Sequence, residues 1–168
     1  MMTTMLPPDD SAVEMEVRAL VMDPVSKMPV VILHDRGENR YLPIWIGVCE
    51  ANAIALELEG VKTPRPMTHD LIGAILATVG FRVERIVVHN LADNVFLAAI
   101  HLLDDEGRAY EVDSRPSDAI AVALRAKAGI FVSPSVLKQA VVEEADQEEA
   151  VKMILERLRP EDLGEYEM

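Results

Sequence analysis

The most restrictive feature of this chain is the way its apolar spacing changes along residues 13–140. Apolar side chains first recur at every second position, as at Val13, Met15 and Val17, which is the spacing of a strand with one buried face. Further on, the spacing becomes helical, returns to short β-type runs, and becomes helical again. This order predicts an α+β fold with a mostly antiparallel sheet.

The turn residues between these runs divide the chain into elements. We expect strands at 13–23, 30–34 and 41–46, which together form an antiparallel meander, and further strands at 81–91, 95–103 and 108–112, with a short edge strand at 130–132. We expect about three core helices, at 48–58, 69–78 and 116–127, and a helical turn at 134–139.

The ends of the chain differ in composition from the middle. Residues 1–12 are predicted to be a flexible N-terminus, 13–140 a single domain, and 141–168 an acidic linker followed by a C-terminal amphipathic helix at 147–158. No apolar run reaches the roughly 18 residues of a membrane span, and the N-terminus lacks the basic start of a signal peptide. We therefore expect a cytoplasmic protein without a membrane partner. The single cysteine, Cys49, is expected to be a small buried residue.

The net charge of −13 argues against a broad basic track for nucleic acid. Residues 141–168 carry ten acidic and three basic side chains, a net −7, so the rest of the chain is only mildly acidic. A local cationic pocket remains compatible with this balance. The acidic C-terminal segment is also a candidate contact for a protein partner.

The first polar cluster, Pro64 to Asp70, begins a predicted helix. Two prolines hold Arg65 in an extended segment, and Thr68 is a good N-cap, so Arg65 and Thr68 are candidate phosphate-binding residues. His69 and Asp70 are candidate catalytic residues, because histidine can act as a general acid or base near neutral pH. The alternative is structural: Thr68 caps the helix, Asp70 complements its dipole, and Arg65 pairs with a carboxylate elsewhere.

The second cluster, Asp113 to Asp118, lies at another strand-to-helix junction. Helix capping explains much of it, because Pro116 suits the first helical turn. Two acids around an arginine also suit chemistry: Asp113 and Asp118 are candidate catalytic residues and metal ligands, and Arg115 is a candidate phosphate clamp.

A third junction, Gly47 to Glu50, adds one more carboxylate. Glu50 at a helix start either complements the helix dipole or supplies a third metal ligand beside Asp113 and Asp118. The predicted ion is Mg²⁺ or Mn²⁺. The chain has no nucleophile elbow, Walker loop, paired CxxC or HExxH.

Three segments resemble the bifunctional nuclease domain family: LPIWIGVCEANAIALELEG at 42–60, PRPMTHDL at 64–71 and VDSRPSDAIAVALRAKAGIFV at 112–132. The resemblance extends over about 13–137 in the right order. It implies a domain that self-associates into a homo-oligomer and cleaves both DNA and RNA, as a metal-assisted phosphodiesterase. The site residues proposed above rest on spacing and not on the family.

Two hypotheses remain open at this point. One is a nuclease in which the three junctions converge. The other is a non-enzymatic oligomeric binding module for a small anion or a protein partner. The acidic charge and the seven aromatic residues, which leave few rings for base stacking, favour the second, whereas the family resemblance favours the first.

Overall fold

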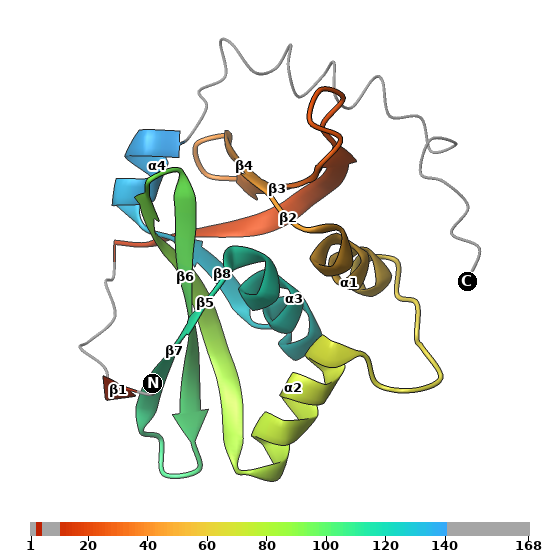
Figure 1. Cartoon of the computed structure of the whole chain (residues 1–168). Helices are drawn as coiled ribbons and strands as arrows, with labels where there is room; N and C mark the ends of the chain where they lie inside the picture. The colour runs from red at the N-terminus through yellow and green to blue at the C-terminus, as the bar shows by residue number, and fades with distance from the viewer. Residues whose placement is uncertain (1–2, 5–10, 141–168) are drawn as a thin grey trace.

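The computed structural model describes residues 3–4 and 11–140. The described strands form one sheet in the order β1-β7-β6-β5-β8-β2-β3-β4, antiparallel except for the pair β5 and β8 (Figure 1). The predicted α+β class is confirmed. The strands are β1 Thr3–Thr4, β2 Val13–Met22, β3 Pro29–Asp35, β4 Arg40–Trp45, β5 Phe81–Ala92, β6 Val95–Asp104, β7 Ala109–Ser114 and β8 Gly129–Val132.

Local turn chemistry sets the hairpins that the sequence predicted. β2, β3 and β4 form the expected antiparallel meander. β5 and β6 are joined at Asp93 and Asn94, whose φ angles are 50° and 61°. Two consecutive left-handed residues are what a tight hairpin turn needs, and Asp and Asn tolerate that conformation better than most side chains.

One strand prediction needs correction. β8 was expected at an edge, but it lies in the middle of the sheet, between β5 and β2, with Ile130 and Val132 buried. The helix before it carries the chain back across the sheet, so that β8 runs parallel to β5. Within the N-terminus, which was expected to be flexible, Thr3 and Thr4 pair with β7.

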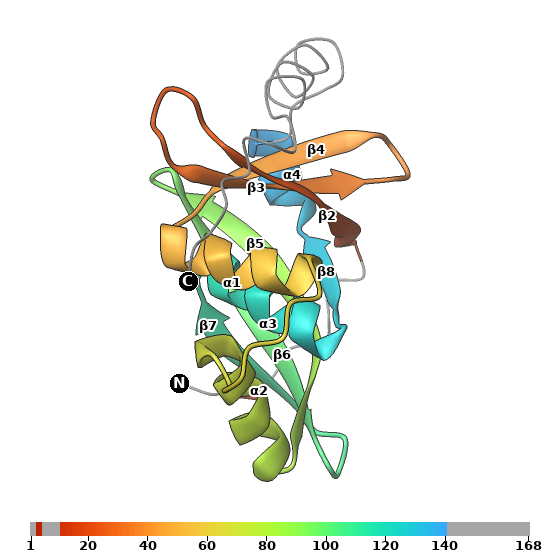
Figure 2. The same ribbon diagram turned by 90° about the vertical axis from the view of Figure 1, so that its right-hand side faces the viewer.

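Four helices occur in the described residues: α1 Val48–Leu58, α2 Thr68–Thr78, α3 Pro116–Ala126 and α4 Pro134–Ala140. Helix α3 packs on β5, β6 and β8, and α1 and α2 lie beside it on the same face of the sheet (Figure 2). Ala119, Ile120 and Ala123 of α3 are completely buried. Because alanine side chains are small, the α3 backbone can approach the sheet closely, which makes α3 the support for whatever α1 and α2 carry.

The remaining predictions concern the C-terminal segment, membrane spans and Cys49. The acidic linker and the amphipathic helix at 147–158 lie outside the described residues. Among the described helices, none is both long and apolar enough to cross a membrane. Cys49, which was expected to be buried, is exposed.

Candidate functional site

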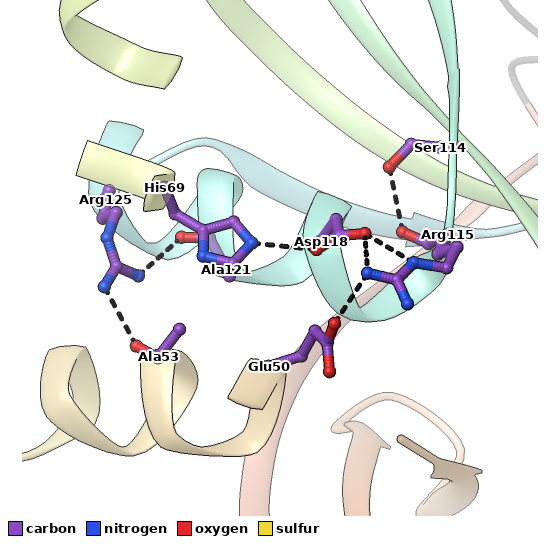
Figure 3. Close-up of polar contacts among 8 residues, drawn as sticks. All are labelled: Glu50, Ala53, His69, Ser114, Arg115, Asp118, Ala121 and Arg125. Atoms are coloured by element: carbon purple, nitrogen blue, oxygen red, sulfur yellow. Dashed lines mark hydrogen bonds and ion pairs between the residues drawn. The ribbon is translucent and has the colours of Figure 1, made fainter. Parts of the chain in front are cut away.

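Side chains from the first turns of three helices meet on the helical face of the sheet (Figure 3). Glu50 comes from the first turn of α1, His69 from that of α2, and Asp118 from that of α3, while Arg115 is the residue that precedes α3. We call these four residues the junction cluster. They come from all three polar segments that the sequence singled out.

Asp118 lies at the centre of the junction cluster. His69 Nε2 is 2.9 Å from Asp118 Oδ1, and Arg115 Nε donates to Asp118 Oδ2 at 2.7 Å. Arg115 Nη2 also donates to Glu50 Oε1 at 2.6 Å. Asp118 therefore holds an imidazole with one oxygen and a guanidinium with the other, and Arg115 links two carboxylates.

Burial is uneven across the junction cluster. The side chains of His69 and Glu50 are 9% and 16% exposed, whereas that of Arg115 is 66% exposed. Hydrogen bonds donated first to Asp118 and then to Glu50 raise the pKa of the Arg115 guanidinium above its ordinary value. Arg115 thus keeps its charge and presents it to solvent, while the buried His69 contacts the other oxygen of Asp118.

Gly47 makes room for the Glu50 side chain. It precedes α1, and a Cβ atom built at Gly47 would collide with the carboxylate of Glu50. The absence of a side chain at this position allows Glu50 to fold back over the start of its own helix while it reaches Arg115.

Arg125, which sequence reasoning missed, holds the three helices together. Its Nε donates to Asp70 Oδ1 at 2.6 Å, Nη1 to the Ala121 carbonyl and Nη2 to the Ala53 carbonyl, both at 3.0 Å. The available signal was its position seven residues after Asp118, which places both on one face of α3. Arg125 therefore fixes the start of α2 against α1 and α3.

Asp70 has a structural position. Its second oxygen, Oδ2, accepts the backbone N–H of Met67 at 2.8 Å. That bond, followed by the Arg125 guanidinium, holds the pKa of Asp70 below its usual range. With both oxygens engaged in capping α2 and binding Arg125, Asp70 positions the helix that carries His69.

Asp113 does not join the junction cluster. In β7, Val112 packs against the main core and pairs with Ile100, so the next residue, Asp113, points to the opposite face of the sheet, beside Ala99. The sheet itself separates Asp113 from Glu50 and Asp118.

The predicted Mg²⁺ or Mn²⁺ site does not fit this arrangement. Arg115 occupies the space between the carboxylates of Glu50 and Asp118, and Asp113 is on the other face. Within residues 3–4 and 11–140, no group of three or more His, Cys, Asp or Glu side chains is placed to hold a metal ion.

Arg65 and Thr68 lie beside the junction cluster, not in it. Met67 takes the N-cap position that was expected for Thr68, which is the exposed first residue of α2. Arg65 lines a pocket of about 410 Å³, together with Lys62 and the Asp70–Arg125 pair. The pocket thus shares its wall with the residues that position His69.

Comparison with known proteins gives this arrangement a family context. The chain is 38% identical over 162 residues to "Uncharacterized protein MT1877" of Mycobacterium tuberculosis (strain CDC 1551 / Oshkosh), covering 89% of this chain and 96% of that protein. "Uncharacterized protein Rv1829" of M. tuberculosis (strain ATCC 25618 / H37Rv) matches to the same extent.

A more distant relative has a functional name. "Bifunctional nuclease 1" of Oryza sativa subsp. indica is 23% identical over 106 residues, covering 62% of this chain but only 32% of the rice protein. The Bifunctional nuclease domain matches residues 31–145, which include all three junctions. The chain therefore belongs to the bifunctional nuclease domain family.

Proposed function

We propose that this chain is a nuclease that hydrolyses phosphodiester bonds in DNA and RNA at the junction cluster. The observation that carries the proposal is the contact of the buried His69 with Asp118, 2.9 Å apart, while the other oxygen of Asp118 binds the exposed guanidinium of Arg115. Membership of the family and the name of the rice relative support the reaction class.

The N-terminal ends of three helices would favour binding of a phosphate. The first turns of α1, α2 and α3 supply side chains to one point, and the positive ends of helix dipoles favour anions. Arg115 adds a full charge that reaches solvent, while its Nε and Nη2 remain bound to Asp118 and Glu50. Arg65 in the neighbouring pocket, and Thr68 at the start of α2, would contact phosphates that flank the cleaved bond.

Proton transfer is assigned to His69. Asp118 holds Nε2 and orients the ring, which leaves Nδ1 to accept a proton from an attacking water. The water oxygen bonds to phosphorus, the bond to the leaving oxygen breaks, and the proton passes on to that leaving oxygen. Because the nucleophile is water and not the ribose 2′-hydroxyl, the same residues serve DNA and RNA. No step is assigned to a metal ion.

The test is cleavage of single-stranded RNA and DNA by the full chain with Mg²⁺, with Mn²⁺ or with EDTA. Asp118→Asn should reduce the rate by at least about 100-fold, the usual contribution of an acid–base group. Asp113→Asn, which removes the same charge from the opposite face of the sheet, should leave the rate unchanged. Loss in Asp113→Asn alone would contradict the assignment, and equal residual cleavage in every sample would indicate a contaminant and refute the nuclease.

Two observations favour a second candidate, the non-enzymatic binding module for a small anion or a protein partner. Arg115 already pairs with both carboxylates of the junction cluster, and the chain carries a net charge of −13. In that case Asp118→Asn would weaken folding or ligand binding, and purified protein would cleave neither nucleic acid.

A further inference from the structure

The pocket of about 410 Å³ beside the junction cluster lies between the end of α1 and the start of α2. Its lining comes from the last turns of α1, the connecting segment 61–67 and the Asp70–Arg125 pair, and we call it the α1–α2 pocket. Figure 1 shows the connection as the yellow loop beside α1. The volume falls within the range of about 300–1,000 Å³ that is typical of small-molecule sites.

The connecting segment is held in place without a ligand. The Val61 N–H donates to a carbonyl of α1 at 2.9 Å, and Thr63 Oγ1 donates to the Arg65 carbonyl at 2.7 Å. Pro64 and Pro66 restrict the backbone on both sides of Arg65. A site that is already formed loses little conformational freedom when a ligand binds, which favours binding.

Two cations in the α1–α2 pocket are available to a ligand. Lys62 and Arg65 are exposed, and the charged end of neither side chain bonds to any residue that the structure describes. Arg125 on the pocket wall differs, because Asp70 and two backbone carbonyls already accept its hydrogen bonds. In a chain with a net charge of −13, two unpaired basic side chains in one concave site favour an anion.

The rest of the lining suits the other parts of a nucleotide. Val61, Pro66 and Met67 form an apolar wall on which a flat base can rest, and Val61 and Met67 are 46% and 40% exposed. Glu57 lines the pocket from the end of α1, and its carboxylate bonds to no described residue. A free carboxylate accepts hydrogen bonds from sugar hydroxyls. Phosphate, base and sugar therefore each have a matching group in one pocket.

We propose that the α1–α2 pocket binds a nucleoside monophosphate, with the phosphate on Lys62 and Arg65 and the base on the apolar wall. The guanidinium of Arg65 supplies a planar pair of donors for two phosphate oxygens, and Lys62 adds a point charge. A nucleoside lacks the charge for these cations, and inorganic phosphate lacks the apolar surface and the sugar hydroxyls. We expect a dissociation constant on the order of 100 μM for a ligand of this size.

The test is isothermal titration of the full chain with adenosine monophosphate in metal-free buffer. Adenosine and inorganic phosphate should each bind at least about 10-fold more weakly, because each lacks part of the contacts. Arg65→Gln should weaken binding of the nucleotide at least about 10-fold. Arg18→Gln is the matched control and should bind like wild type, because Arg18 is exposed on β2 and does not line the pocket.

Three results would overturn the proposal: no binding of adenosine monophosphate at about 5 mM, an equal loss in Arg65→Gln and Arg18→Gln, or inorganic phosphate that binds as tightly as the nucleotide. Thermal unfolding of Arg65→Gln without ligand should match wild type, because the charged end of Arg65 bonds to no described residue. A weaker binding in this variant therefore reports the lost contact and not a damaged fold.

The role of the pocket rests on the nuclease proposed above, whereas binding of the nucleotide does not. The Asp70–Arg125 pair lines the pocket and positions the helix that carries His69, so the bound nucleotide stands for the unit of a strand that flanks the cleaved bond. Adenosine monophosphate should therefore inhibit cleavage in competition with the strand. Cleavage that the bound nucleotide leaves unchanged would overturn this role and leave the nuclease intact. Binding of the nucleotide by a protein that cleaves neither nucleic acid would refute the nuclease and leave the nucleotide site intact.

Discussion

Replacing Arg125 by methionine should destabilise the domain by about 3 kcal/mol, because one side chain bonds all three helices around the junction cluster. The substitution removes a charged bond to Asp70 and two bonds to the carbonyls of Ala53 and Ala121, on a side chain that is only 11% exposed. A bond to a charged group contributes about 1.5–3 kcal/mol and a neutral one about 1 kcal/mol. Asp70 is 35% exposed and can turn to water, which lowers the loss from the simple total of about 3.5–5 kcal/mol to about 3 kcal/mol.

The assay is urea unfolding at neutral pH, with the midpoint converted to a free energy at constant slope. Arg36→Met is the matched control, because Arg36 is 78% exposed and its pairing with Glu16 lies at the surface. Pairs of that kind contribute at most about 1 kcal/mol. If Arg125→Met costs no more than Arg36→Met, the idea that Arg125 fixes the helices is wrong. The double variant Asp70→Asn/Arg125→Met should lose less free energy of unfolding than the sum of the losses in the two single variants.

Three further predictions concern stability. Burial lowers the pKa of His101, so the unfolded chain binds a proton at this histidine at a higher pH than the folded chain does. The urea midpoint of unfolding should therefore fall as the pH drops through about 6.5, and it should fall less in His101→Gln. Leu42→Ala, at a fully buried position, should cost about 2–5 kcal/mol in urea unfolding, and a loss below about 1 kcal/mol would contradict its place in the core. Lys127 ends α3 with a φ of 53°, so Lys127→Gly should raise the melting temperature, and a decrease would refute strain at that residue.

Elements with local signals were predictable from the sequence, and the order of the sheet was not. Alternation and turn residues defined the meander and the β5–β6 hairpin. The central place of β8 depends on a crossover through α3, which no short window of sequence encodes. The position of Asp113 was unpredictable for the same reason. The face of the sheet on which its side chain lies is decided by its pairing with Ala99 of the neighbouring strand β6.

The junction cluster was predictable in its members but not in its contacts. Polar residues at or just before the starts of predicted helices identified Glu50, His69, Arg115 and Asp118. The sequence could not show that Arg115 would stand between the carboxylates of Glu50 and Asp118. Arg125 was missed because a basic residue in the last turn of a helix is ordinary, and its partners come from distant segments.

The central claim is that His69 and Asp118 act as one catalytic unit. The most direct measurement is the single-turnover rate of cleavage of one labelled oligonucleotide by wild type, His69→Gln, Asp118→Asn and the double variant. We expect each single change to reduce the rate by at least about 100-fold and the double variant to be no slower than the worse single one. Two losses that multiply, or a rate that either change leaves intact, would contradict the claim.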